Sequence, residues 1–114
     1  MASFVVDYFE LPAGDAGRTS GFFKAAFGWA LQAYGPDYVE LREAGTLGGV
    51  NGDASDHSKA PLIGIRTDDI AAAEAAIVKA GGTISNKTYD YPGGKRFFFR
   101  EPGGSELLVY QPNA

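Results

Sequence analysis

Hydrophobic and polar residues alternate along the chain in two different periods. Residues 4–11 are rich in β-branched and aromatic side chains and predict a strand. Residues 16–27 follow the helical period, with Asp15 as a candidate N-cap and Gly28 as a helix stop. The apolar residues on one face of that helix are Phe22, Phe23, Ala26 and Phe27. Three further strands are predicted at residues 30–34, 38–43 and 46–51.

The same order of elements begins again after a polar loop. Residues 61–67 predict a buried strand, and Asp68 or Asp69 caps a helix that runs to Ala80. Its apolar face consists of Ile70, Ala73, Ile77 and Ala80. Further strands are predicted at residues 83–90, 95–100 and 106–111. The pattern is therefore strand, helix and three strands, twice.

This repeat predicts the organisation of the chain. The two helix caps, Asp15 and Asp69, lie 54 positions apart, and half of the 114 residues is 57. We expect one domain, 1–114, with module one at 1–57 and module two at 58–114. A βαβββ unit has an open sheet edge and one uncovered face. The predicted fold class is α+β, with tandem βαβββ modules that form curved mixed sheets, helices on the outer face and a concave cup on the other.

Alternation along the strands predicts which side chains face the cup. In the first strand the helix side receives Val5, Phe9 and Leu11, with Asp7 as a polar exception. Tyr8 and Glu10 then point into the cup. The same parity places Ile63 and Ile65 under the second helix and leaves Arg66 for the cup.

The other predicted strands add aromatic residues to this surface. Tyr110 faces the cup in the last strand, and of the consecutive aromatic residues 97–99 we expect Phe97 or Phe99 to line it. Trp29 and Tyr34 are placed near its rim, and the glycines of residues 46–52 allow a ligand or a neighbouring chain to approach closely. The predicted ligand-binding residues are Tyr8, Glu10, Trp29, Arg66, Phe97, Phe99 and Tyr110. Aromatic rings with a few charges suit a small, flat or cationic organic ligand.

Composition excludes several classes of protein. The chain has no cysteine and one histidine, so thiol chemistry and cysteine- or histidine-rich zinc sites are absent. His57 stands in a polar loop, where a solvated histidine is the expected role. A net charge of −4 argues against a nucleic-acid partner. No apolar run is long enough to span a membrane and no leader is evident, so we expect a cytoplasmic protein.

Three segments resemble a known family. They are FELPAGDAGRTSGFFKAAFGW at residues 9–29, TDDIAAAEAAIVKAGG at 67–82 and FFREPGGSELLVYQ at 98–111. Together they are similar to the glyoxalase/bleomycin resistance/extradiol dioxygenase superfamily, also called vicinal oxygen chelate proteins. The resemblance covers nearly the whole chain and implies the fold of that superfamily. It leaves the activity open, because the superfamily hosts isomerases, dioxygenases, thiol transferases and simple binding proteins.

The resemblance also implies where a metal ion would bind. Enzymes of this superfamily hold a divalent metal through His, Glu or Gln on the concave strands. Three of those positions fall on Tyr8, Leu62 and Leu108, and the fourth falls within residues 46–51, which hold no His or Glu. Leucine is no ligand and tyrosine is a rare one, so we expect no metal cofactor. Glu10 and Glu106 are the substitute carboxylates.

Two functions follow as hypotheses, with a third beside them. The first is a homodimeric, metal-free binding protein of the bleomycin-resistance type that holds a small organic molecule in the cup, without nucleic-acid or membrane partners. The alternative is a metal-dependent lyase, isomerase or dioxygenase of glyoxalase type with an atypical divalent metal site. A module that recruits a protein partner is the third.

Overall fold

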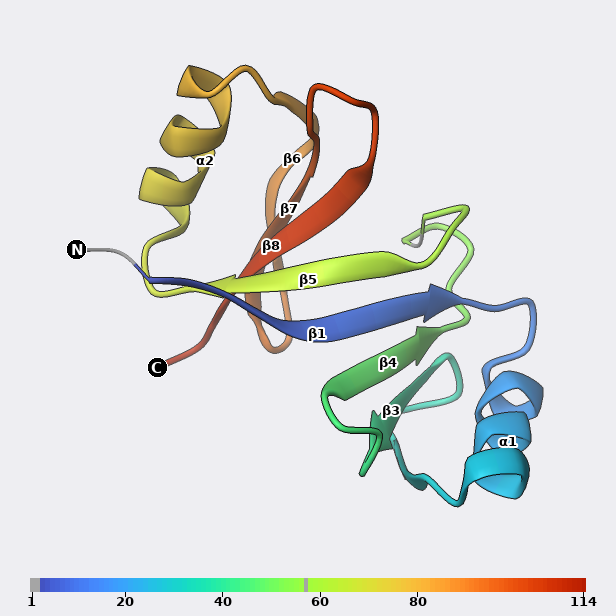
Figure 1. Ribbon diagram of the computed structural model, residues 1–114. Coiled ribbons are helices and arrows are strands. Elements are labelled where there is room, and N and C mark those ends of the chain that lie inside the picture. Colours follow the sequence, from blue (N-terminus) through green and yellow to red (C-terminus); the bar gives the residue numbers. More distant parts are fainter. Residues whose placement is uncertain (1–2, 57) are drawn as a thin grey trace. The chain divides into compact units, whose positions relative to one another are not determined.

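The structure, a computed structural model, describes residues 3–56 and 58–114, so the predicted loop histidine His57 lies outside the described residues. Two helices and eight strands follow one another along the chain (Figure 1). Their bounds are β1 Phe4–Pro12, α1 Ala16–Phe27, β2 Ala30–Ala33, β3 Tyr38–Arg42, β4 Leu47–Asn51, β5 Leu62–Thr67, α2 Ile70–Lys79, β6 Thr83–Tyr91, β7 Gly94–Arg100 and β8 Glu106–Pro112.

This element order confirms the predicted fold class, α+β with a βαβββ arrangement that occurs twice. The strands join in the order β2-β3-β4-β1-β5-β8-β7-β6. Within each repeat the first and fourth strands pair in parallel, β1 with β4 and β5 with β8, and the other pairs are antiparallel. Each predicted strand lies within one residue of its observed bounds at either end.

The chain divides into two compact units, which are described separately below. The α1 unit consists of Tyr8–Leu62. The α2 unit consists of Ile63–Ala114 together with the part of β1 that ends at Asp7. The strand β1 therefore contributes its first half to one unit and its second half to the other.

Both helices begin at the predicted type of cap. The Arg18 amide donates a hydrogen bond to the Asp15 carboxylate at 3.1 Å, and the Ala72 amide donates one to Asp69 at 3.0 Å. Gly28 ends α1 in the left-handed conformation with φ 73°, which glycine adopts without strain. Among the described residues no helix is both long and apolar enough to cross a bilayer.

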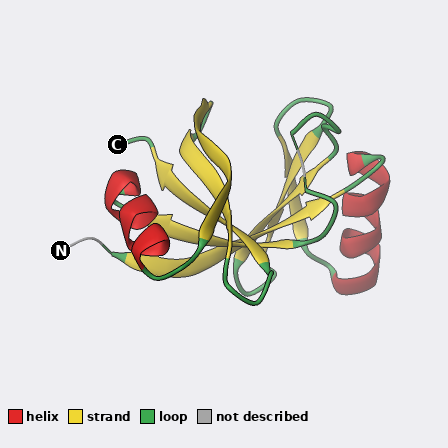
Figure 2. Ribbon diagram, turned by 90° about the horizontal axis from the view of Figure 1, so that it is seen from above, coloured by secondary structure: helices red, strands yellow, loops and turns green. Residues whose placement is uncertain are grey.

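The core of the α1 unit lies between α1 and one face of its strands (Figure 2). Its buried members are Ala13, Ala16, Val39, Leu41 and Val50, with Phe9, Leu11, Phe23, Trp29 and Leu31 packed against them. The predicted helix face is wrong in part. Phe22 is 59% exposed, because Ala16, Ser20 and Phe23 form the stripe that turns toward the sheet. Phe27 continues that stripe but ends the helix, where it is 61% exposed and its ring lies 5.4 Å from that of Trp29.

The core of the α2 unit lies in the same way between α2 and its strands. Its buried members are Ala73, Phe97, Phe99 and Val109, with Ile65, Ile70, Ile77, Ile84 and Leu107 packed against them. The predicted positions of Ile65 in the strand and of Ile70, Ala73 and Ile77 in the helix are confirmed. Ile63, expected beside Ile65 under α2, is instead 49% exposed. In each unit the helix covers one face, and we call the other side of the strands the open face.

Candidate ligand-binding faces

The open face of the α1 unit carries a row of two glutamates with a glycine between them. Gly49 of β4 is the register partner of Glu10 on β1 and of Glu40 on β3. Because Val39, Leu41 and Val50 point into the core on the helix side, these three positions point the opposite way. Glu10 faces away from α1, as predicted, and is 1% exposed.

The glycines of β4 let aromatic side chains approach the strand on both faces. A methyl group at position 48 would overlap the Phe9 ring on the helix side. One at position 49 would overlap the hydroxyl oxygens of Tyr8 and Tyr38 on the open face. The close approach predicted for these glycines is therefore made by the chain's own side chains.

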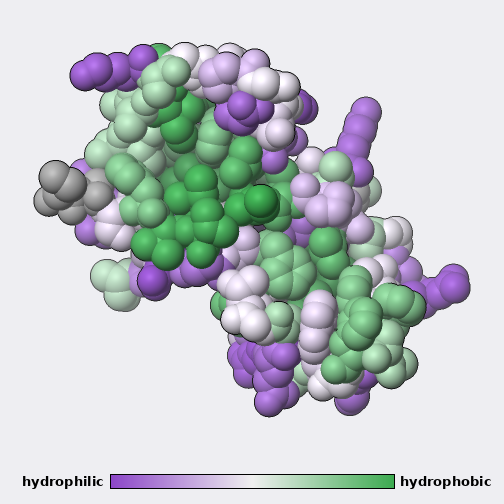
Figure 3. Space-filling view, viewed as in Figure 1, coloured by the Kyte–Doolittle hydropathy of each residue, from purple (hydrophilic) through white to green (hydrophobic). Residues whose placement is uncertain are grey.

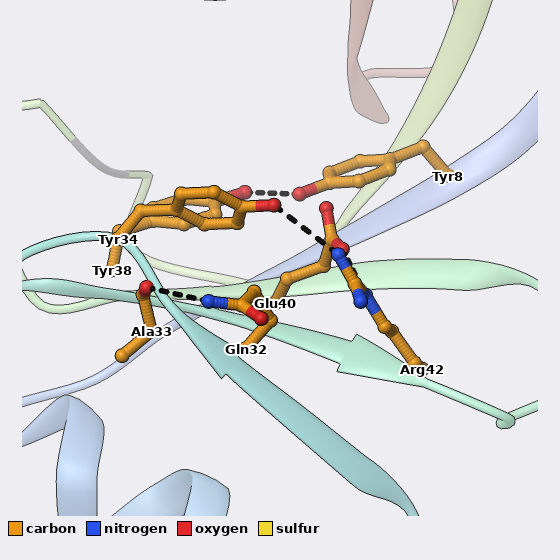
Figure 4. A network of polar contacts seen from close by, with 7 residues as sticks. All are labelled: Tyr8, Gln32, Ala33, Tyr34, Tyr38, Glu40 and Arg42. Carbon is orange, nitrogen blue, oxygen red and sulfur yellow. Dashed lines mark hydrogen bonds and ion pairs between the residues drawn. The ribbon is translucent and has the colours of Figure 1, made fainter.

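Tyrosine hydroxyls gather over this row (Figure 4). Those of Tyr8 and Tyr38 point toward each other and share a hydrogen bond across Gly49. Arg42 joins the neighbouring groups, because its Nε contacts the Glu40 carboxylate at 2.6 Å and its Nη2 donates to the Tyr34 hydroxyl at 3.2 Å. The hydrogen bond to Glu40 is the main cause of a raised pKa for Arg42.

This arrangement offers hydrogen bonds of several kinds within a small area. A phenol both donates and accepts, a carboxylate accepts, and a guanidinium donates. The Gln32 side chain stands next to Glu40 in the β2–β3 register and donates to the Ala33 carbonyl at 3.2 Å. The face is therefore suited to a polar organic molecule with more than one oxygen or nitrogen atom.

The open face of the α2 unit has a different row, formed by two arginines with a tyrosine between them. Tyr110 of β8 is the register partner of Arg66 on β5 and of Arg96 on β7. The Tyr110 hydroxyl donates a 2.5 Å hydrogen bond to Asp7, and Arg66 Nε lies 3.1 Å from the other oxygen of that carboxylate. Burial, followed by the bond to Asp7, raises the pKa of Tyr110.

Aromatic rings hold Arg96 in place. Its guanidinium carbon lies 5.5 Å from the ring centre of Tyr89, 5.6 Å from that of Tyr91 and 5.3 Å from that of Phe98. Its Nε also donates a 2.5 Å hydrogen bond to the Tyr89 hydroxyl. Arg96 is 7% exposed, so this cation is buried among rings rather than solvated.

The predicted position of Phe97 or Phe99 on the cup surface is wrong. Both pack under α2 with Ala73 and Val109. Strand alternation turns the middle ring of the three, Phe98, to the open face, where it stacks on Tyr89 at 6.5 Å.

Trp29 is a second correction of placement. Its ring stacks on Phe23 at 5.2 Å with an angle of 6° and meets Phe9 edge-on at 6.4 Å. The turn at Gly28 brings the residue after the helix back onto the helix-side core. Trp29 therefore belongs to the packing of α1 rather than to the rim of an open face.

Asp7 also differs from the alternation. The parity of β1 grouped Asp7 with the helix-facing residues, yet its carboxylate contacts Arg66 and Tyr110. The contact confirms that Arg66 and Tyr110 share a face.

Sequence reasoning missed several residues of the two faces. They are Tyr38, Glu40, Arg42, Tyr89, Arg96 and Phe98. The signal was present in the alternation of residues 38–42, where Val39 and Leu41 are apolar and their neighbours polar. The same alternation in residues 96–99 pairs Arg96 with Phe98 and Phe97 with Phe99.

The positions implied for a metal ion carry no metal-binding cluster. Leu62 is 3% exposed and Leu108 is 2% exposed, and neither side chain has an electron pair to donate. Of the substitute carboxylates, Glu106 accepts a hydrogen bond from Ser85 at 2.8 Å and lies 3.8 Å from Arg100. Within residues 3–56 and 58–114 no three His, Cys, Asp or Glu side chains come together.

Comparison with known proteins places this fold in a family. The profile of the Glyoxalase/Bleomycin resistance protein/Dioxygenase superfamily matches residues 5–109. The chain belongs to that superfamily. No curated protein sequence matches it.

Solved structures with the same fold come from several proteins. A superfamily member from Vibrio splendidus 12B01 is 18% identical, with a TM-score of 0.67 and coverage of 99% of this chain and 100% of that one. Methylmalonyl-CoA epimerase from Mycobacterium tuberculosis is 13% identical, with a TM-score of 0.73 and coverage of 96% and 89%. The Mn(II)-bound glyoxalase from Novosphingobium aromaticivorans is 14% identical, with a TM-score of 0.61 and coverage of 95% and 38%. At these identities the likeness is one of fold.

Proposed function

We propose that this protein binds a small organic molecule on the open faces of its sheet without a metal cofactor. The proposal rests on the residues at the superfamily's metal-ligand positions. Tyr8, Leu62 and Leu108 stand there in place of the usual His, Glu or Gln. On the α1 unit, the hydroxyl groups of Tyr8 and Tyr38 lie over Gly49, beside the buried carboxylate of Glu10. Tyr8 and Glu10 are the proposed ligand-contacting residues there, and Arg66 and Tyr110 are those of the α2 unit.

The donor set supports binding without a metal. Two of the implied positions carry buried leucines, so a divalent ion would depend on one phenol and on carboxylates that occur singly. Residues of this kind do not fit the usual metal centre of the superfamily. Phenols, carboxylates and guanidinium groups instead recognise a polar organic ligand directly by hydrogen bonds.

A metal measurement tests the first half of the proposal. Protein purified without chelator is analysed by mass spectrometry for manganese, iron, nickel and zinc, and then titrated with MnCl2 and NiCl2 by calorimetry. We expect less than a tenth of an equivalent of any metal and no saturable heat. Stoichiometric metal in the purified protein overturns the proposal.

A nuclear magnetic resonance screen tests the second half. The 15N-labelled protein is titrated with benzoate, benzylamine and small polyols, and the amides of Tyr8 and Gly49 are followed. We expect at least one probe to shift these signals while the Trp29 indole N–H, which lies on the helix side, stays in place. Tyr38→Phe is the matched variant, because it removes one hydroxyl and keeps the ring. Uniform small shifts, or none, contradict ligand binding at this face.

The alternative is a metal-dependent enzyme of the glyoxalase type with an atypical site. Glu10 favours it, since a carboxylate that is 1% exposed beside tyrosine hydroxyls is the chain's best candidate for an unusual ligand. Two of the similar structures are an epimerase and a Mn(II)-bound glyoxalase. Loss of bound metal in Glu10→Gln, if metal is found, separates this function from the first.

Homodimer formation and a cytoplasmic location stay predictions from the sequence. Exposed hydrophobic residues of the α2 unit support association, and they are Phe4, Val5, Val6, Ile63 and Val78. Figure 3 shows a hydrophobic surface on this unit beside α2. Sedimentation velocity at micromolar concentration is expected to give a species of twice 12.0 kDa.

A further inference from the structure

Two side chains bind the Asp7 carboxylate as they could bind the carboxylate of a ligand. Both oxygens of Asp7 are engaged, Oδ1 by the Tyr110 hydroxyl at 2.5 Å and Oδ2 by Arg66 Nε at 3.1 Å. Charge-assisted hydrogen bonds of this kind are about twice as strong as neutral ones. The Tyr110 hydroxyl and the Arg66 guanidinium are therefore arranged to bind the two oxygens of one carboxylate.

The two donors are held firmly relative to each other. Arg66 and Tyr110 are register partners in the parallel pairing of β5 with β8. The Tyr110 hydroxyl is protonated at neutral pH, as an ordinary phenol is, and is therefore a donor. The Arg66 side chain is 53% exposed and is open to a molecule from solution.

The acceptor is within reach of solvent. The Asp7 side chain is 30% exposed, so it is neither fully buried nor as exposed as Arg66. A partly exposed ion pair contributes little to stability, so displacing Asp7 from it costs little. Asp7 also lies far from Arg66 and Tyr110 along the chain, whereas Glu40 is two residues from its partner Arg42.

We propose that Arg66 and Tyr110 form a carboxylate-binding site for a small organic acid, and that Asp7 occupies this site until such a ligand displaces it. The inference deepens the proposed function, and rests on it, by naming the chemical class of ligand on the α2 unit. No covalent step is involved. Asp7 becomes solvated as the ligand carboxylate takes its two hydrogen bonds. Since Asp7 competes from within the same chain, simple acids bind the wild-type protein weakly.

The test removes the internal competitor. Sodium benzoate is titrated at constant ionic strength into 15N-labelled wild-type protein and Asp7→Ala, and the Arg66 Nε–H signal is followed. We expect the dissociation constant of benzoate to fall at least about tenfold in Asp7→Ala, by loss of the intramolecular competitor. The added substitutions Arg66→Met and Tyr110→Phe should each abolish this gain, and benzylamine should not bind the site.

A matched control separates a built site from a released arginine. Glu106→Ala removes the carboxylate beside Arg100, which keeps its 3.0 Å hydrogen bond to the Gly104 carbonyl. The Arg100 side chain is also 53% exposed but has no tyrosine hydroxyl beside it in the observed contacts. We expect no gain in benzoate affinity from this variant. An equal gain in Glu106→Ala, or no gain in Asp7→Ala, overturns the inference.

A substitute variant and a separate criterion for the proposed function complete the test. If Asp7→Ala does not fold by amide spectra, Asp7→Asn replaces it, with a gain in the same direction expected and no gain counting against the site. The proposed function fails separately, when no organic probe shifts the Tyr8 and Gly49 amides of the wild-type protein. The benzoate result on the Asp7 variants depends only on Arg66 and Tyr110.

Discussion

The two units are alike on the side that faces the helix and differ on the open face. The register gives equivalent rows on the helix side, Leu11, Val50 and Val39 in the α1 unit and Ile65, Val109 and Phe97 in the α2 unit. The equivalent open-face rows are Glu10, Gly49 and Glu40 against Gly64, Leu108 and Phe98. Every helix-side position is apolar in both units. On the open face, the α1 row has a glycine between two glutamates, whereas the α2 row has a glycine, a leucine and a phenylalanine.

The difference separates what packing requires from what a ligand requires. A helix on a sheet needs apolar side chains of suitable volume, whatever their exact identity. The side away from the helix does not pack on a helix, and its residues differ in chemistry between the units although Glu10, Leu108 and Phe98 are buried. The α1 unit has tyrosines and carboxylates there, and the α2 unit has Arg96 held by rings and Arg66 paired with Asp7.

The largest expected effect concerns the helix-side row. Phe97 is fully buried, so Phe97→Ala should lower the free energy of unfolding by about 3–5 kcal/mol. The equivalent Val39→Ala removes less apolar volume and should cost about 1.5 kcal/mol. Urea denaturation followed by circular dichroism measures both. Equal losses would show that the two cores do not differ in their reliance on one large side chain.

The next effect concerns the glycine under the tyrosines. Gly49→Ala should cost about 1–3 kcal/mol, because the new methyl group overlaps the hydroxyls of Tyr8 and Tyr38. Gly21→Ala is the control, since no atom lies within 4 Å of its added methyl group and the helix gains about 0.5–1 kcal/mol from alanine. Thermal denaturation of both variants should therefore move in opposite directions. A stable Gly49→Ala protein would mean that the tyrosine pair does not rest on this strand.

A smaller effect distinguishes the arginines of the two faces. Arg96→Lys should cost about 1–2 kcal/mol, because an ammonium group cannot stack flat on three rings as a guanidinium does. Arg42 is half-exposed, and Arg42→Lys should leave stability unchanged. Urea midpoints of the two variants provide the comparison. Equal midpoints would mean that the rings stabilise the Arg96 guanidinium group no more than water would.

The smallest effect is a pH dependence of the α2 unit. The pKa of Tyr110 is raised in the folded protein, so above pH about 10 the unfolded chain loses this proton first. Stability should then fall with rising pH, with a contribution of up to about 1.4 kcal/mol per pH unit from this group. Urea midpoints between pH 8 and 11 should decline more steeply for the wild type than for Tyr110→Phe. Parallel declines would assign the loss to other groups.

Prediction from sequence succeeded where a local pattern decides the outcome. Strand bounds, the caps at Asp15 and Asp69, and the helix side of Phe9 and Leu11 all follow from alternation and from side chains that bond nearby amides. The class of fold followed from the repeat of elements. Family membership followed from motifs that extend over both repeats.

Prediction failed where contacts between distant segments decide the outcome. Trp29 was expected near an open face, but the turn after Gly28 stacks it on Phe23. Phe22 was expected in the core face and is exposed, because the sheet contacts the neighbouring stripe of Ala16, Ser20 and Phe23. Helical spacing indicates an apolar face, but only the packing partner selects which part of it is buried.

The sequence by itself determined the α+β repeat, the position of each strand and helix, and the poverty of metal-binding side chains, because periodicity, capping and composition are local properties. The tertiary structure alone decided which polar residues meet. Tyr8 joins Tyr38 across Gly49, and Asp7 joins Arg66 and Tyr110, through pairings of strands that are distant in sequence. Strand register depends on the partner strand as well as on the residues of one segment, so the chemistry of each open face emerged only from the folded chain.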